Sequence, residues 1–428
     1  MQGSRRARVR VLGVMTAVLG AMFVVTQTVM AAVTWGSATA VAPSFSWNDG
    51  GALARSTTSS TSYLHAVFAS DVIGGVPATD GGPYTSVYYT RGNPSGSTWG
   101  TPKRLNGSTT HAVSPVVIAN GAKVIAAFVT LAHWDAYDPA EPRHIKMRFN
   151  TNHGASGSWT SGSFDPGTAR VDRPALAAFG DGGFLLTYTD ADTGEIVVVT
   201  CGDLTVGGDT GCSGSSVGTT TRLAADPADG YEGLPVIAAV GSVRAVAWLK
   251  SNDGGISAAT RSTGNWSSPT TLTSAPADGL SAAAASGRFA FSWAENTGVK
   301  LKMRVSGTWQ PTRTVGSASP TGTYHYVYTT AVALASSSTV GVAFAACKRT
   351  DCQATDTAGV DLRWRESSDN GATWKSAVTV AAFTASSSRR YNDFPSVVMS
   401  SATKRFVMYN TASATGSSYR VLIRVGSG

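Results

Sequence analysis

A short unit recurs along almost the whole length of this sequence and limits the folds that are open to it. Each copy has a strand-like segment ending in Arg, a turn of small residues, and a Trp that begins the next segment. The copies run from Arg91 to Trp99, Arg148 to Trp159, Arg261 to Trp266, Arg304 to Trp309 and Arg365 to Trp374. Repetition at this spacing indicates an array of equivalent supersecondary structures.

Between the Trp residues, short apolar segments alternate with turn-forming residues, which is typical of antiparallel strands. In the fourth unit, for example, we expect strands over 234–240, 244–249, 256–261 and 266–272. Several first strands are expected to begin with Pro, because a strand's first residue needs no ladder donor. These prolines are Pro43, Pro115, Pro174, Pro235 and Pro395.

The number of units is seven. Six lie between about Ala42 and Ala382, and the third of them carries a Cys201–Cys212 loop in place of its Trp. The last unit has only three strands of its own, over 395–399, 404–409 and 419–425.

The two ends of the mature chain complement each other. The C-terminal segment from Arg424 to Gly428, followed by Val33-Thr34-Trp35, matches the stretch from Arg304 to Trp309. We therefore expect the segment 33–41 to be the outer strand of the last unit, which leaves no sheet edge open. The predicted fold is all-β, a seven-bladed β-propeller of four-stranded antiparallel blades, with a six-bladed ring as the alternative.

The N-terminus has the pattern of a signal peptide. Four arginines up to Arg10 precede an apolar run over 11–25, and Val29-Met30-Ala31 supplies small residues for cleavage. A membrane anchor is the alternative, but the run is shorter than the ~20 residues that a spanning helix needs. We expect a signal peptide over 1–31, one propeller domain over 32–428, and a secreted protein that either diffuses or stays at the cell surface.

Charge and cysteine content narrow the choice of partners. Residues 1–31 contain four Arg and no acidic residue, so their removal lowers the formal charge from +8 to +4. No basic stripe remains in the mature chain, which argues against nucleic-acid binding. The cysteines form two close pairs, Cys201 with Cys212 and Cys347 with Cys352. In an exported protein this spacing favours two local disulfides, whereas metal binding is disfavoured because no His lies at ligand spacing. No cofactor is predicted, and we expect a monomer.

The unit that ends at Trp374 resembles the Asp-box, or BNR repeat, of the sialidase superfamily. The resemblance rests on Ser367, Asp369, Gly371, Thr373 and Trp374, and with its weaker copies it covers essentially the whole mature chain. It implies a propeller whose boxes lie on the rim, away from the active site. Members of that superfamily hold a substrate carboxylate with three arginines and use an Asp acid and a Tyr–Glu nucleophile. The Arg-Ile-Pro motif that normally carries their first arginine does not occur in this chain.

Strand direction predicts where a site lies. Loops between second and third strands share one face with the connections between blades, and the Asp-box turns lie on the opposite face. The loop from His133 to His144 is long and rich in Trp, Tyr and acidic residues, as functional loops often are. Candidate substrate-binding residues are Trp134, Tyr137, Arg143, Arg173, Tyr324, His325, Arg390 and Tyr391, and candidate catalytic groups are Asp135, Asp138, Glu232, Tyr231 and His133.

Some of these patterns also have structural interpretations. Asp172 and Asp393 stand two residues before a Pro and are expected to cap turns. Tyr231 and Tyr391 share a repeated position that is equally typical of packing, and Arg389 with Arg390 is typical of a solvated pair.

These residues favour a protein that binds a glycan or polysaccharide, because aromatic rings with Arg, His and carboxylates suit sugar stacking and carboxylate recognition. Binding without turnover is favoured, since no acid–nucleophile pair is assigned. One alternative is a glycoside hydrolase that uses Asp135 or Asp138 with Glu232. Another is a polysaccharide lyase with His133 or Tyr231 as base and Arg173 on the substrate carboxylate. The third is a cell-surface scaffold that binds protein.

Overall fold

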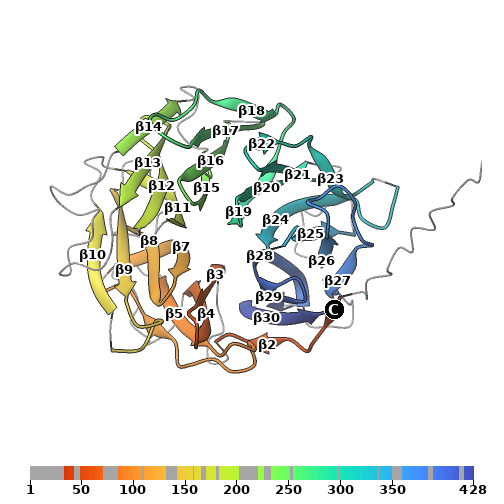
Figure 1. The fold of residues 1–428 in the computed structure, drawn as a ribbon. Coiled ribbons are helices and arrows are strands. Elements are labelled where there is room, and N and C mark those ends of the chain that lie inside the picture. The colour runs from red at the N-terminus through yellow and green to blue at the C-terminus, as the bar shows by residue number, and fades with distance from the viewer. Residues whose placement is uncertain are drawn as a thin grey trace, which may run out of the picture. The chain divides into compact units, whose positions relative to one another are not determined.

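The seven expected units fold into seven separate antiparallel sheets arranged around a central axis (Figure 1). The structure is a computed structural model. It describes residues 33–42, 49–70, 85–107, 110–131, 142–157, 159–164, 170–179, 183–201, 220–225, 233–250, 254–295, 298–319, 321–335, 337–348, 359–383, 389–413 and 419–428. The predicted signal peptide lies outside these residues, whereas residues 33–428 form one compact unit.

Each sheet is one propeller blade, and its strand numbers rise from the axis outwards, except in blade 7, where β1 and β2 are outermost. Blade 1 contains β3 (Asp49–Thr57), β4 (Ser62–Ser70), β5 (Ser86–Gly92) and β6 (Lys103–Arg104); blade 2 contains β7 (His111–Asn120), β8 (Lys123–Leu131), β9 (Arg143–Asn150) and β10 (Trp159–Phe164). Blade 3 contains β11 (Val171–Phe179), β12 (Gly183–Asp190), β13 (Glu195–Cys201) and β14 (Thr220–Ala225); blade 4 contains β15 (Val236–Val240), β16 (Val243–Leu249), β17 (Ile256–Arg261) and β18 (Thr270–Thr273).

The remaining three blades follow the same order. Blade 5 contains β19 (Asp278–Ala285), β20 (Arg288–Glu295), β21 (Gly298–Val305), β22 (Thr308–Trp309) and β23 (Arg313–Ser317); blade 6 contains β24 (Tyr326–Leu334), β25 (Val340–Cys347), β26 (Val360–Ser367) and β27 (Val378–Ala381). Blade 7 contains β28 (Arg389–Ser401), β29 (Lys404–Ser413) and β30 (Tyr419–Ser427), completed by β1 (Thr34–Trp35) and β2 (Thr39–Ala40). The seven-bladed prediction is confirmed, and no helix occurs in the described part of the chain.

The second strand of each blade is sandwiched between neighbouring blades. In β25 every residue is buried, and in β8 all residues after Lys123 are buried. This explains why the second strands are nearly continuous apolar runs rather than alternating patterns. Among the described residues, the core accordingly contains one large cluster for each of the seven seams between adjacent blades, and a small eighth cluster formed by Ala345, Cys347 and Val360.

The N-terminal segment closes the ring as predicted, by pairing with β30. Its register differs from the expected match to blade 5. Trp35 lies opposite Gly426, whereas Trp309 lies opposite Arg304. A two-residue turn fixes Trp309, but no turn joins β1 to β30, so the pair is free to shift. The ring of Trp35 covers Gly426, where a Cβ atom would come within 2.8 Å of the ring.

Two details of the strand predictions need correction. Trp266 is not in a strand, since β18 begins only at Thr270. Pro115, Pro174 and Pro395 lie inside their first strands rather than at the first residue. Each lies within a break in register, between 113 and 116, 172 and 175, and 393 and 396. A β-bulge leaves a residue unpaired, which accommodates the missing donor of Pro. Pro43 lies outside the described residues.

The Asp box forms a closed network of hydrogen bonds at the turn between β26 and β27. Ser367 Oγ donates to Asp369 Oδ1 at 2.7 Å, while Thr373 donates its N–H to Oδ1 at 2.8 Å and its hydroxyl to Oδ2 at 2.6 Å. Burial alone would raise the pKa of Asp369, but these bonds outweigh it and hold the pKa below its ordinary value. Gly371 adopts a φ of 80°. The carboxylate is thus used by the turn itself, as a structural role requires.

The described cysteines lie at strand ends. Cys201 and Cys347 are fully buried, and neither is a free thiol in the described part of the chain. Cys212 and Cys352 lie outside the described residues, so the two pairings stay predictions. Over the same described residues, no helix is long and apolar enough to cross a membrane.

Candidate functional site

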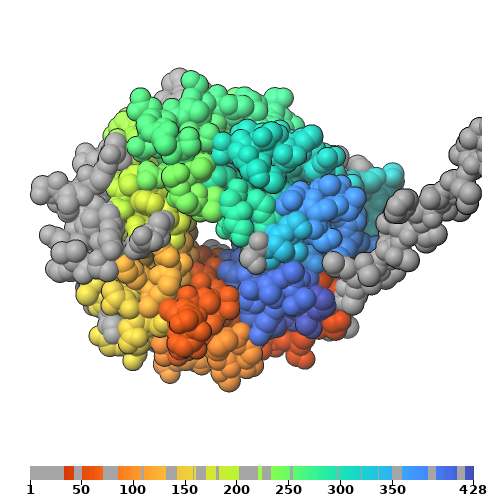
Figure 2. Space-filling model, viewed as in Figure 1, coloured from red at the N-terminus to blue at the C-terminus, as the bar shows by residue number. Residues whose placement is uncertain are grey.

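The face that carries the connections between blades, here called the connection face, surrounds one mouth of a central channel. All seven inner strands line this channel, whose volume is about 590 Å³. Figure 2 shows its opening between the blades. Its lining side chains are mostly Ala, Val, Leu, Ile and Met, and Arg55 is the one charged residue among them. The described channel wall therefore contains no carboxylate, which a hydrolytic centre on the axis would need.

A repeated backbone feature surrounds the mouth. Among the described residues, one residue at the entry of the inner strand has a positive φ in five blades: Ser114, Arg173, Leu234, Gly279 and Phe394. Pro follows it in all but blade 5. A positive φ is unusual for residues other than Gly and marks a backbone that its surroundings hold in place.

Asp side chains fix this conformation in three blades. Oδ1 of Asp172 accepts the N–H of Arg173 at 2.8 Å, and Asp278 and Asp393 bond the next residue in the same way at 2.6 Å. The interpretation of Asp172 and Asp393 as capping residues therefore agrees with the structure. The same geometry leaves the side chain of the following residue at the rim of the mouth.

Two aromatic rings are exposed here. Phe394 is 47% exposed and Tyr326 is 37% exposed, and they are the exposed large hydrophobic residues of the described chain. They lie at the entries of the inner strands of adjacent blades, β28 and β24. Phe394 was not among the predicted site residues. The available signal was the tripeptide Asp-Phe-Pro, which repeats the Asp-Arg-Pro of residues 172–174.

Of the two predicted arginines in blades 2 and 3, only one remains available to a ligand. Arg143 donates from Nη1 to Asp172 Oδ2 at 3.1 Å, and its side chain is only 11% exposed. Arg173 is 56% exposed, with Nε 3.9 Å from the same oxygen. The two residues therefore differ in role: Arg143 holds the capping Asp172, while Arg173 occupies the position that Phe394 occupies in blade 7.

Tyr324 is not free to stack on a ligand. Its hydroxyl donates to Asp361 Oδ2 at 2.7 Å and accepts Arg363 Nη1 at 2.5 Å. Burial, reinforced by Asp361, raises the pKa of Tyr324 to about 12. Asp361 also accepts Lys348 Nζ at 2.9 Å and the N–H of Phe383 at 2.8 Å. This carboxylate is saturated, so the pair lacks the free base that a tyrosine nucleophile needs.

The other predicted residues are placed only in part. His325 is half-buried, and its backbone N–H donates to the backbone carbonyl of Cys347 at 2.7 Å. The backbones of Arg390 and Tyr391 belong to β28, but their side chains are not described. The remaining candidates lie outside the described residues: His133, Trp134, Asp135, Tyr137, Asp138, Tyr231 and Glu232.

The remaining acidic side chains described at this face all have partners. Asp190 and Glu195 bind Arg222, and Asp192 accepts the N–H of Arg170 at 3.2 Å. Glu295 accepts Trp293 Nε1 at 2.9 Å. Among the residues that the structure describes, no three potential ligands cluster in a way that would hold a metal ion.

The fold is similar to those of solved sialidase structures. The phage phi92 endosialidase has 9% identity, and the match covers 92% of this chain and 69% of that one with a TM-score of 0.50. The Hadza microbial sialidase Hz136 has 12% identity, coverage of 88% and 65%, and a TM-score of 0.49. A protein of unknown function from Dyadobacter fermentans has 11% identity, coverage of 92% and 99%, and a TM-score of 0.48.

These matches concern the fold alone. This chain spans less than two thirds of the length of the Hadza sialidase. No family model and no curated protein matches the sequence. The seven blades, the complete Asp box and the likeness to the phage endosialidase together identify a divergent β-propeller with the sialidase fold.

Proposed function

We propose that this chain is a secreted glycan-binding propeller whose connection face holds a carbohydrate without cleaving it. The observation that carries the proposal is the exposure of Phe394 and Tyr326 at the mouth of the channel, with Arg173 presented by an equivalent bulge. Exposed rings stack on the apolar face of a sugar, and a guanidinium binds a carboxylate or hydroxyl groups.

The backbone at Phe394 supports a role in binding. A non-glycine residue with a φ of 47° costs roughly 1–2 kcal/mol relative to an ordinary conformation. Nearly half of the side chain is exposed, so the ring gives the fold little packing energy in return. A ligand surface explains why a bulky ring occupies a position that suits Gly better.

The contacts of the described carboxylates favour binding over hydrolysis. Asp172, Asp361 and Asp393 are all engaged by neighbouring groups, and no described pair is free to act as acid and nucleophile. The hydrolase and lyase alternatives depend on residues of the 133–144 loop and on Tyr231 and Glu232.

The rest of the proposal concerns the mature protein. We propose that it is exported after removal of residues 1–31, that it is monomeric, and that Cys201–Cys212 and Cys347–Cys352 are disulfides. The basic and apolar N-terminal segments and the close spacing of the cysteines support this.

Affinity electrophoresis with product analysis tests the function. The mature protein is run through gels containing neutral polysaccharides, uronans or sialylated glycoproteins, and the same glycans are analysed for released sugar and unsaturated product. Retardation without product is expected. Sugar release would establish the hydrolase, unsaturated product would establish the lyase, and no retardation in any gel would refute carbohydrate binding.

A further inference from the structure

The repeat that defines the blades also places an arginine at an equivalent point in six of them. This arginine lies within the last four residues of the third strand, in β5, β9, β17, β21, β26 and β30. All of these strands run towards the face that carries the Asp-box turn, here called the box face, which is opposite to the connection face. The six residues, here called the arginine ring, are Arg91, Arg148, Arg261, Arg304, Arg365 and Arg424.

None of the guanidinium groups in the arginine ring makes an ion pair with a residue that the structure describes. Three of them hydrogen-bond only to backbone carbonyls, as Arg91 Nη1 does to the carbonyl of His153 at 3.2 Å. The other three have no hydrogen-bond partner in the described part of the chain, and these are Arg261, Arg304 and Arg424. All six side chains are half-buried, so each keeps some contact with solvent. Their positive charges are therefore not neutralised within the described fold.

Arginines at the connection face have different surroundings. In blades 2 and 3, four of them have an Asp carboxylate at 2.9 to 3.9 Å, and these are Arg143, Arg170, Arg173 and Arg222. The chain thus contains acidic residues that pair with arginines, but it places them at the connection face. The lack of ion pairs in the arginine ring is consequently a property of the box face.

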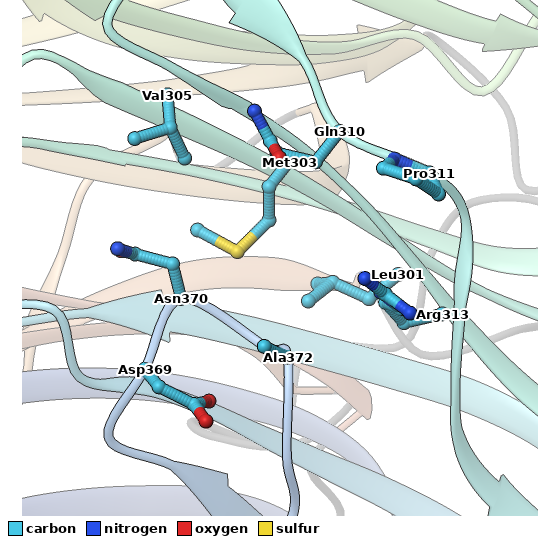
Figure 3. A pocket seen from close by; sticks show the side chains of 9 residues that line it. All are labelled: Leu301, Met303, Val305, Gln310, Pro311, Arg313, Asp369, Asn370 and Ala372. Carbon is cyan, nitrogen blue, oxygen red and sulfur yellow. The ribbon is translucent and has the colours of Figure 1, made fainter. Parts of the chain in front are cut away.

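The described carboxylates of the box face do not change this balance. Among the side chains that the structure describes, only Glu366 and Asp369 bring a carboxylate there. Glu366 binds both Arg405 and Lys375, which are two cations for one anion. Asp369 lies on the box turn, and Figure 3 shows it on the opposite side of a small pocket from Arg313. The described box face therefore carries an excess of positive charge.

Two further arginines add to this charge at the starts of the second strands β16 and β20. Arg244 Nη1 donates to Thr200 Oγ1 at 3.2 Å, and Arg288 Nη1 donates to Asn370 Oδ1 at 2.7 Å, so both have neutral partners. Burial lowers the pKa of both groups, and the charge of Arg261 lowers the pKa of Arg244 further. A cation that disfavours a second cation is the effect expected of a positive potential at this face.

The long side chains of the arginine ring also have a packing role. The guanidinium of Arg91 lies 4.4 Å from the centroid of the Tyr63 ring, and that of Arg148 lies 5.9 Å from the centroid of the Phe128 ring. Packing of this kind uses the stem and one face of the guanidinium, and it leaves room for a carboxylate at the edge. It explains why arginine occurs at these positions, but it does not explain why all six lack an anion.

The arrangement of the arginine ring favours a flat partner. Its members belong to different blades, so they surround the axis and do not follow a groove (Figure 1). A linear polyanion contacts only part of such a ring, whereas a flat negatively charged surface meets all of it. Each Lys or Arg near an anionic lipid surface strengthens binding about fivefold. The exposed large apolar side chains of the described chain, Phe394 and Tyr326, are on the other face, so binding through the box face should be electrostatic.

We propose that the box face docks on an anionic phospholipid membrane through the arginine ring, and that the connection face then points away from the membrane. The inference goes beyond the proposed function, because it uses the opposite face and stands whether or not the mouth of the channel binds a glycan. The sequence alone shows no basic stripe, since the members of the arginine ring are far apart along the chain and only the closed ring of blades brings them to one surface.

Co-sedimentation of the mature protein with lipid vesicles tests the proposal. The vesicles contain phosphatidylcholine alone, or phosphatidylcholine with a third of it replaced by phosphatidylglycerol, and each is used at low and at high salt. The box-face variant is Arg261→Gln/Arg304→Gln, and Arg261→Lys/Arg304→Lys keeps the charge at the same positions. The matched control is Lys250→Gln/Arg420→Gln, which removes the same charge from the connection-face ends of β16 and β30. Chromatography on immobilised heparin provides a linear polyanion for comparison.

The proposal predicts binding to the vesicles that contain phosphatidylglycerol, no binding to phosphatidylcholine alone, and weaker binding at high salt. The two Gln substitutions in the arginine ring should weaken binding roughly 25-fold, about fivefold for each charge, while the Lys pair and the control pair stay within about twofold of the parent.

Four results would each overturn the proposal. They are no binding to the phosphatidylglycerol vesicles, equal binding to both kinds of vesicle, an equal loss in the Gln pair and the control pair, and an equal loss in the Gln pair and the Lys pair. Retention on heparin without binding to vesicles would also overturn it, and would assign the arginine ring to a linear polyanion instead.

Discussion

Arg405 and Glu366 form a buried ion pair across the seam between blades 7 and 6, with Nε of Arg405 2.6 Å from Oε2 of Glu366. The side chain of Arg405 is completely buried, and that of Glu366 is 3% exposed. Arg405 also donates to the carbonyls of Ala402 and Gly428, and Lys375 binds the other oxygen of Glu366 at 2.9 Å. The pair therefore joins the last blade to its neighbour.

The Arg405→Met variant tests this seam. It leaves the Glu366 carboxylate buried with only Lys375, and removing one partner of a buried pair costs about 3–5 kcal/mol. Urea unfolding should show a loss in that range. The double variant Arg405→Met/Glu366→Leu should recover part of it, whereas a single variant within about 0.5 kcal/mol of the parent would show that the pair is unimportant.

A substitution at Trp35 tests how much closure of the ring by β1 contributes to stability. Its ring contacts that of Trp364 edge-on, with centroids 5.8 Å apart, and it covers Gly426. Trp35→Ala should lower the free energy of unfolding by about 2–3 kcal/mol, below the usual cost for a buried Trp because this ring is only half-buried. Chemical denaturation is the measurement. No loss of stability would mean that β1 contributes little to the last blade.

The burial of His65 predicts that the folded protein loses stability in acid. It is fully buried between Ser56 Oγ at 2.8 Å and Tyr89 OH at 2.7 Å. Burial, with smaller contributions from Arg91 and His153, lowers its pKa from 6.5 to about 3. The folded state thus binds fewer protons than the unfolded state, and the stability that His65 contributes is present above about pH 6.5 and lost as the pH falls towards 3. By linkage the loss reaches about 4–5 kcal/mol.

Urea unfolding at several pH values between 7 and 4 measures this effect. The His65→Gln variant keeps a polar side chain but cannot titrate, so its stability should fall less over the same interval. Parallel pH profiles for the two proteins would assign the acid sensitivity to other groups.

Substitutions at Phe394 should separate the effect of backbone strain on stability from the role of the ring in binding. Phe394→Gly relieves the positive φ and should raise the free energy of unfolding by about 1 kcal/mol over Phe394→Ala, which removes the ring but keeps the strain. Thermal unfolding of the two variants is the comparison. A less stable Phe394→Gly would show that the conformation at this residue is not strained.

Whether the sequence predicts a structural feature of this protein depends on how far apart along the chain the residues that form the feature lie. Blade number and closure follow from local turns and from the match between Arg424 and Trp35, so both are predictable. The register of β1 is not, because no turn connects it to β30. Tyr324 illustrates the same limit at the site, since Asp361 and Arg363, which take its hydroxyl, are more than thirty residues away.

The solvent exposure of individual side chains is equally hard to predict from the sequence. Arg143 and Arg173 look alike in sequence, yet one is buried against Asp172 and the other projects from a bulge. The bulge depends on how the inner strand meets its partner. Only a comparison of residues 172–174 with residues 393–395 would have drawn attention to Phe394.

The central claim is that the connection face binds a carbohydrate through side chains presented by the bulges. Its most direct test is calorimetric titration of the best-retained glycan into the parent protein, Phe394→Gly and Ser114→Gly. Ser114→Gly alters the same bulge position in blade 2 but removes only a small hydroxymethyl group. The account predicts that Phe394→Gly weakens binding about tenfold or more, within the range of a lost stacking contact, while Ser114→Gly binds as the parent does. Unchanged affinity in Phe394→Gly would contradict it.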